Sequence, residues 1–144
     1  MKQHQDNPMP AFHLAFHVTD LDKSRMFYGN ILGCQEGRSA ETWVDFDFFG
    51  NQISLHLGTP FPVTKSGKVG KHDVPMPHFG AVLPMPQWRD LLARLEDQQI
   101  EFEIPPQIRF AGEPGEQATM FFYDPSGNPI EIKGFHDESG VFAS

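Results

Sequence analysis

YDPSGNPIEIK, residues 123–133, is the stretch of this sequence that decides its fold. Pro125 presets the backbone of a turn that Gly127 and Asn128 complete. The Ile-Glu-Ile that follows alternates apolar and polar side chains, as a half-buried strand does. Glu131 is therefore predicted to be a carboxylate on a strand whose other face is apolar. Burying such a charge is costly unless a cation lies nearby.

Composition bounds the rest. The chain has 144 residues, of which 39% are hydrophobic, and this suits one compact domain with its own core. Cys34 is the single cysteine, so no internal disulfide is expected and a reducing compartment is favoured. The first residues carry no apolar segment of the signal-peptide kind, and no run is long enough to span a bilayer, so we expect a cytoplasmic protein. The formal charge of −8 argues against nucleic acid or acidic membranes as partners.

The first half of the chain predicts a strand, a helix and three more strands. Residues 12–18 alternate, with His13, Ala15 and His17 on the polar face. Asp20 is expected to cap a helix that ends at Gly33. The three strands that follow are expected at residues 35–38, 42–49 and 52–57.

The second half repeats this order after a stretch without periodicity. Residues 78–83 form the first expected strand, and Pro86 opens an amphipathic helix. The remaining strands are expected at residues 100–104, ended by Pro105-Pro106, then at 117–123 and 129–133 after a loop at 107–116. Gly50-Asn51 and Gly127-Asn128 each join the third strand of a half to its fourth. We therefore predict one α+β domain built from two βαβββ modules in tandem.

The predicted organisation has five parts. They are a flexible N-terminus (1–10), the first βαβββ module (11–58), a connector (59–77), the second βαβββ module (78–135) and a tail (136–144).

Three runs carry a resemblance to a known family: HLAFHVTDLDKSRMFYGNILG from residue 13, HFGAVLPMPQWRDLLARL from residue 78 and FFYDPSGNPIEIKG from residue 121. Together they resemble the vicinal oxygen chelate superfamily, which includes glyoxalase I, bleomycin-resistance proteins, fosfomycin-resistance enzymes and type I extradiol dioxygenases. The resemblance covers residues 11–135 and implies paired sheets that form a cleft around one divalent metal. It implies that His13, His78 and Glu131 are the metal ligands.

The residues themselves agree with this ligand set. His13 and His78 open the two halves, so a pseudo-twofold axis would bring them together, and Glu131 supplies an anion. Two histidines and one carboxylate are the facial triad of non-haem Fe²⁺ enzymes, and with Ni²⁺, Zn²⁺ or Mn²⁺ they make a Lewis-acid site. The alternative interpretation is ordinary: two hydrogen-bonded or surface histidines and a solvated glutamate.

The fourth ligand of glyoxalase I enzymes is a glutamate, and here the aligned turns place Ser54 at that position. His56 lies roughly 6.6 Å further along the same strand face, as a fourth ligand, an acid or base, or a structural residue. His17 is roughly 13 Å from His13 along its strand, which makes it a pocket candidate rather than a ligand. Tyr123 is a candidate phenol near the metal, and Arg109 is a candidate anchor for an anionic substituent, although core packing of Tyr123 and solvation of Arg109 are the commoner roles of such residues.

Three functions remain open at this point. The first is a dioxygenase-like oxidoreductase that acts on a small, vicinally oxygenated aromatic substrate; the missing fourth carboxylate and the fourteen phenylalanines favour it. The second is a glyoxalase-type lyase or isomerase with a Lewis-acid metal, which a ligating His56 would favour. The third is a metal-free drug-binding protein, against which the retained ligands argue. The resemblance also implies a homodimer, in which the ligands of one site come from one chain or from two.

Overall fold

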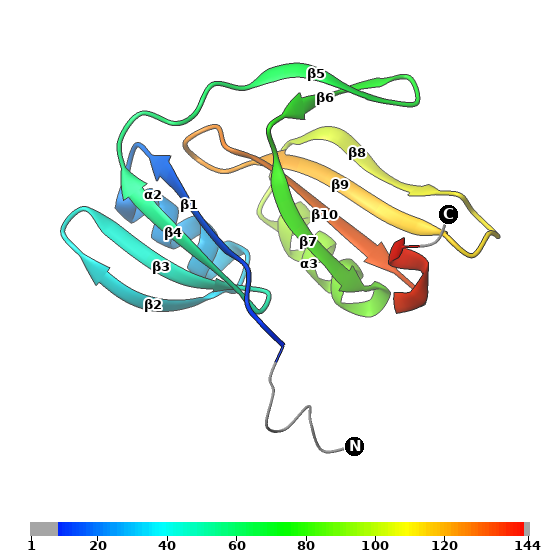
Figure 1. Ribbon diagram of the computed structural model, residues 1–144, viewed down its shortest axis with the longest axis horizontal. Helices are drawn as coiled ribbons and strands as arrows, with labels where there is room; N and C mark the ends of the chain where they lie inside the picture. The colour runs from blue at the N-terminus through cyan, green and yellow to red at the C-terminus, as the bar shows by residue number, and fades with distance from the viewer. Residues whose placement is uncertain (1–8, 143–144) are drawn as a thin grey trace.

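The computed structural model describes residues 9–142, which form two modules of the same topology (Figure 1). The first module contains β1 (His13–Val18), α2 (Leu21–Arg25), the π-helical segment η1 (Met26–Ile31), β2 (Gln35–Ala40), β3 (Trp43–Phe48) and β4 (Asn51–Leu57). Its sheet has the order β1-β4-β3-β2, with β1 parallel to β4 and the other pairs antiparallel.

The second module repeats this arrangement. It contains β7 (Phe79–Pro84), α3 (Met85–Asp97), β8 (Phe102–Arg109), β9 (Gln117–Tyr123) and β10 (Pro129–Phe135), and a short 3-10 helix, η2 (Glu138–Phe142), follows. Its sheet has the order β7-β10-β9-β8, with β7 parallel to β10. The matching strand orders confirm the predicted α+β fold with two βαβββ modules.

The helix of the first module begins and ends where its sequence predicts. Asp20 Oδ1 accepts a hydrogen bond from the Lys23 amide at 2.9 Å, and Gly33 ends the run with a φ of 77°. Between them the α-helix widens into the π-helical turn, in which the Leu32 amide donates to the Phe27 carbonyl. Because the turn is wider, the consecutive residues Phe27 and Tyr28 are both buried in the core.

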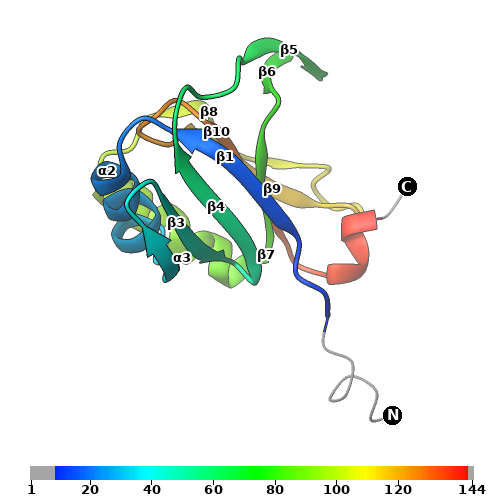
Figure 2. The same cartoon turned by 60° about the vertical axis from the view of Figure 1, so that its left-hand side comes forward.

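The predicted connector is not without regular structure. It contains a hairpin of β5 (Thr64–Val69) and β6 (His72–Met76), a two-stranded sheet that projects at the top of both views (Figures 1 and 2). The alternation of apolar and polar residues did not predict this hairpin, because the pairing register of its two strands shifts between Thr64 and Gly67. Its apolar residues Val69 and Val74 pack on Ile104 and Phe121, so the hairpin covers part of the second sheet.

The expected end of the strand 100–104 at Pro105-Pro106 is wrong. β8 runs through both prolines to Arg109. This is tolerated because β8 is an edge strand, and its register with β9 shifts between Ile104 and Gln107, where the prolines lie. The loop expected from residue 107 therefore begins only after Arg109.

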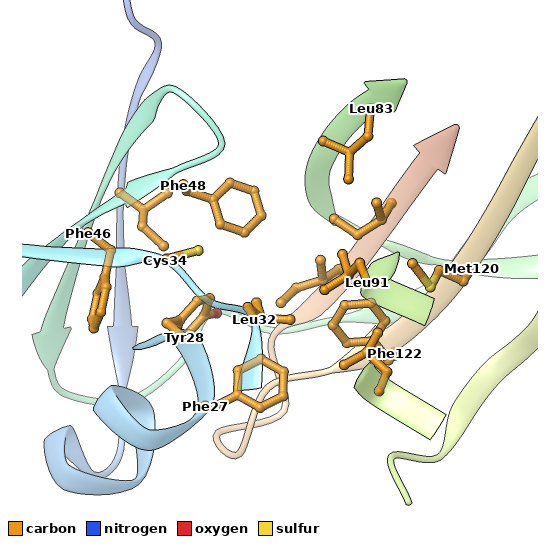
Figure 3. Packing of buried hydrophobic residues seen from close by; sticks show 14 of the residues in the cluster. Phe27, Tyr28, Leu32, Cys34, Phe46, Phe48, Leu83, Leu91, Met120 and Phe122 are labelled. Carbon is orange, nitrogen blue, oxygen red and sulfur yellow. The ribbon is translucent and has the colours of Figure 1, made fainter. Parts of the chain in front are cut away.

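Both modules contribute to one hydrophobic core, shown in Figure 3. The rings of Phe27 and Phe122, from different modules, have centroids 6.1 Å apart. Phe16 of β1 lies on this core, and so do Ile130 and Ile132 of β10. Since side chains alternate along a strand, the polar positions of β1 and β10 point away from the core that the modules share.

The turn at residues 124–128 joins the two modules. The Asp124 carboxylate is 4% exposed and accepts hydrogen bonds from the Tyr28 hydroxyl at 2.8 Å and from the Asn128 side chain at 2.9 Å. It also accepts the backbone amides of Ser126 and Asn128. The Asn128 side chain donates to the His17 carbonyl at 3.1 Å, so the turn is bonded to both modules. None of the described helices is long and apolar enough to cross a membrane.

Candidate functional site

The second module brings two of the predicted ligands together. His78 immediately precedes β7, and Glu131 lies on β10, the strand that pairs with β7. His78 Nε2 lies 3.3 Å from Glu131 Oε1. Their side chains are 24% and 15% exposed, so the pair is largely shielded from water but not sealed.

The second ring nitrogen of His78 fixes its tautomer. Nδ1 lies 2.6 Å from the Pro75 carbonyl oxygen, which can only accept, so Nδ1 carries a proton. In a neutral imidazole the lone pair is then on Nε2, and it faces an oxygen of Glu131. Two acceptors at this distance repel each other unless a proton or another cation lies between them.

The pKa values of the pair reflect this need. The hydrogen bond with Glu131 raises the pKa of His78 above 6.5, although burial acts in the opposite direction. Burial alone would raise the pKa of Glu131, but the hydrogen bonds from His78 and Thr119 outweigh it and lower the pKa below 4.5. The structure therefore favours a positive charge at Nε2 and a negative charge at Oε1.

Two further residues hold Glu131 in place. Thr119 of β9 donates from its hydroxyl to Glu131 Oε2 at 2.6 Å. Gly80 pairs with Glu131 across β7 and β10, and a Cβ at this glycine would overlap the Glu131 carbonyl oxygen. The absence of a side chain at Gly80 thus allows β7, and with it His78, to approach β10 closely.

A cavity of about 190 Å³ opens beside the pair. Val69 and Val74 of the hairpin line it together with Phe121, whose ring centroid lies 4.8 Å from that of His78. Its polar lining includes Arg109 and Lys133 in addition to the pair itself. The arrangement is a small apolar chamber with a few charged groups, as expected of a small-molecule site.

His13 is not grouped with the His78–Glu131 pair in the structure. It is exposed at the start of β1, opposite Gln52, on the face that points away from the shared core. Within residues 9–142 no three His, Cys, Asp or Glu side chains are grouped so that they could hold a metal ion. A single chain therefore brings two of the three predicted ligands together.

The other candidates of the first module lie on the same open face as His13. The Ser54 hydroxyl donates a hydrogen bond to Asp45 Oδ1 at 2.6 Å. Ser54 stands where the resemblance to glyoxalase I enzymes implies a fourth metal ligand, and this hydrogen bond engages its hydroxyl. His56 stacks on Trp43 at 6.3 Å and pairs with His17 in the strand register. The Nδ1 atom of His17 contacts the Thr59 carbonyl at 3.1 Å.

Tyr123 and Arg109 have distinct environments. The Tyr123 hydroxyl donates to Glu103 at 2.9 Å, and burial together with Glu103 raises the pKa of Tyr123 to about 12. Glu103 also binds Lys65 of the hairpin at 2.8 Å, so Tyr123 helps to fix the hairpin over the cavity. Arg109, in contrast, lines the cavity directly.

Sequence reasoning missed Thr119, Gly80 and Lys133. Lys133 had a readable signal, because it lies two residues after Glu131 and hence on the same strand face. Thr119 and Gly80 act on Glu131 across neighbouring strands, and that relation depends on the register, which the sequence does not print.

Comparison with known proteins now places the chain. The model of the Glyoxalase/Bleomycin resistance protein/Dioxygenase superfamily matches residues 11–132. The chain belongs to this superfamily. No curated protein matches the sequence.

Solved structures with a similar fold agree with this assignment. A glyoxalase/bleomycin resistance protein/dioxygenase from Alicyclobacillus acidocaldarius is 31% identical, with a TM-score of 0.75, over 94% of this chain and 98% of that one. Lactoylglutathione lyase from Agrobacterium tumefaciens shares the fold at 14% identity and a TM-score of 0.63, over 96% and 99% of the two chains. The genomically encoded fosfomycin resistance protein from Listeria monocytogenes also shares the fold. It is 19% identical, with a TM-score of 0.65, over 92% of this chain and 97% of that one. Proteins named for different activities thus share this fold.

The opposite pKa shifts of His78 and Glu131 predict a pH range in which their ion pair stabilises the metal-free protein. The lowered pKa of Glu131 gives stability that is present above pH 4.5 and lost as the pH falls through the folded-state value. The raised pKa of His78 gives stability that is full below pH 6.5 and lost as the pH rises through its folded-state value. In chelator, the difference in unfolding free energy between wild type and Glu131→Gln should therefore be largest between pH 4.5 and 6.5.

Urea unfolding across a pH series measures this difference. Asp90→Asn, on the exposed surface of α3, is the control and should give a difference that does not vary with pH. A Glu131→Gln difference that is equally flat would contradict the coupling of the two groups.

Proposed function

We propose that this protein is a metal-dependent enzyme that acts on a small, vicinally oxygenated aromatic molecule, as a dioxygenase-like oxidoreductase. The observation that carries the proposal is the orientation of His78 Nε2 toward Glu131 Oε1, with Nδ1 already bonded to Pro75. A histidine whose far nitrogen is fixed by a backbone carbonyl is the usual arrangement of a metal ligand.

The donor set fits a divalent cation in part. The imidazole lone pair and the carboxylate oxygen face each other across a gap that needs positive charge, and Thr119 orients the carboxylate from behind. Two ligands leave the site incomplete, because stable sites of this kind use at least three protein ligands.

We propose that the third ligand is His13 of a second copy of the chain. His13 is exposed on the open face of the first sheet, and no described group of the same chain completes the site. A twofold dimer that lays the first module of one copy over the second module of the other would make two identical sites. The same contact would bring His56 near the cavity as a candidate acid or base.

The chain's own residues would shape the chemistry. Bound Fe²⁺ would supply open positions for two adjacent substrate oxygens and for dioxygen. Phe121 and Val74 limit the access of water to these positions, and Pro75 and Thr119 keep the ligands oriented. A glyoxalase-type lyase would use a fourth protein ligand at the position of Ser54, but the Ser54 hydroxyl is hydrogen-bonded to Asp45. The proposed site then has three protein ligands, which favours the oxygenase.

Metal content tests the ligand assignment. We expect protein purified without chelator to hold about one divalent ion per chain, and His78→Ala to hold almost none, because the change removes one of three ligands. Elemental analysis measures this, with the exposed His136→Ala as the matched control. Equal metal in wild type and His78→Ala would refute the assignment.

Oxygen uptake tests the reaction class. Uptake with a panel of catechols should require added Fe²⁺ and should be abolished by His78→Ala. Turnover of a hemithioacetal with Ni²⁺ or Zn²⁺ and no oxygen uptake would instead establish the lyase or isomerase. Tight ligand binding without any metal requirement would establish a binding protein of the bleomycin-resistance kind.

A further inference from the structure

We propose that the cavity beside Glu131 selects a single-ring substrate that carries a carboxylate, held by Lys133 and Arg109 at the end opposite the metal ligands. This inference rests on the proposed function, since it names the class of molecule that the same site accepts.

The cavity is positively charged in a negatively charged protein. Glu131 is the one carboxylate among its lining residues, and His78 offsets its charge. Lys133 and Arg109 add two cations, so the positively charged side chains of the lining outnumber its one carboxylate. The whole chain, in contrast, has a formal charge of −8, so the cavity is a local attraction for a small anion.

These two cations differ from their neighbours in forming none of the ion pairs seen among the described residues. The nearby lysines of the hairpin are paired, Lys65 with Glu103 and Lys68 with Asp73. The charge of Lys133 acts on Glu131, since it contributes to the lowered pKa of that carboxyl group. The Arg109 guanidinium lies 5.2 Å from the ring centroid of Phe110. Both residues line the cavity, so an anion bound there would lie near two positive charges.

The volume of the cavity limits the size of the ligand. The cavity measures about 190 Å³, and an apolar cavity of roughly 150 Å³ holds benzene, so it suits one aromatic ring. Lys133 and Glu131 lie two residues apart on one face of β10, a backbone rise of roughly 6.6 Å, and both line this cavity.

The apolar lining gives such a ring a surface to pack on. Phe121 on β9 and Val74 on the hairpin both line the cavity and belong to one apolar cluster. A carboxylate at Lys133 then directs the opposite edge of the ring toward Glu131. We therefore expect 3,4-dihydroxybenzoate to fit better than its 2,3-isomer, whose oxygens lie beside the carboxylate.

Benzoate and benzamide test the anion site without metal, because they share one shape and differ in charge. In chelator, calorimetry should show that wild type binds benzoate about tenfold more tightly than benzamide. Lys133→Met should reduce this preference to about twofold or less. Lys23→Met, on the exposed surface of α2, is the matched control and should keep it. Arg109→Met, on the edge strand β8, gives an independent second measurement if Lys133→Met unfolds early.

Equal binding of benzoate and benzamide, binding of neither, or a preference that survives both variants would overturn the inference. A second arm separates it from the proposed function. If Fe²⁺ fails to tighten 3,4-dihydroxybenzoate while the benzoate preference persists, the metal function fails and the anion site stands. If Fe²⁺ tightens the diol while the preference is absent, the anion site fails and the metal function stands.

Discussion

Heterodimers that combine one His13→Ala chain with one Glu131→Ala chain are expected to hold metal at about half of their sites, although each variant alone holds almost none. In the proposed dimer each site takes His13 from one copy and His78 with Glu131 from the other. One site of the heterodimer then carries both substitutions and the other carries neither. Co-expression with two affinity tags isolates this species, and elemental analysis with oxygen uptake measures the recovery.

A second mixture provides the control. His78→Ala and Glu131→Ala both alter the second module, whose two ligands lie 3.3 Å apart in the same chain. Their heterodimer has one substitution at each site and should recover nothing. If neither mixture recovers metal while wild type binds it, the ligands come from one chain and the proposed exchange is refuted.

Replacing Asp124 with alanine is expected to lower the unfolding free energy by about 3 to 5 kcal/mol. The carboxylate accepts four hydrogen bonds, from the Tyr28 hydroxyl, the Asn128 side chain and two backbone amides. Burial, reinforced by Asp124, raises the pKa of Tyr28 well above 10.0, so the phenol remains a donor that alanine would leave unpaired. Thermal unfolding should show a midpoint lower by about 10 °C.

Two further variants distinguish the loss of the Asp124 hydrogen bonds from the general effect of removing a negative charge. Tyr28→Phe removes one donor and leaves the other three, so it should cost about 1 to 2 kcal/mol. Asp22→Ala removes a carboxylate that is 97% exposed and should change stability by less than about 0.5 kcal/mol. A loss for Asp124→Ala no larger than that for Asp22→Ala would contradict its role between the modules.

The fold was predictable because local signals agreed along both halves of the chain. Asp20 and Gly33 bound the first helix as expected, and the two Gly-Asn turns lie at equivalent positions of the duplicated sheets. The hairpin at residues 64–76 escaped because its register shift breaks the alternation that reveals a strand. The extension of β8 through Pro105-Pro106 escaped because only the sheet order shows that this strand is an edge.

The candidate site was predictable in part for a different reason. Alternation along β10 placed Glu131 opposite the core, and the family resemblance grouped it with His78, which the structure places beside it. What alternation cannot give is distance between modules, and so the sequence could not show that His13 would lie apart from this pair. The supports from Thr119 and Gly80 depend on strand register, which emerges only from the folded sheet.

The Asp-Pro-Ser-Gly-Asn turn has a consequence for how such proteins are sorted. It is the most recognisable part of the sequence, yet its Asp124 carboxylate accepts hydrogen bonds from Tyr28 and Asn128 and so holds the two modules together. The turn therefore accounts for how the two modules are held together, and its recognition in a sequence points to this architecture rather than to a reaction. Under the proposed function, the reaction and the substrate would instead depend on the residues at positions 54, 109 and 133.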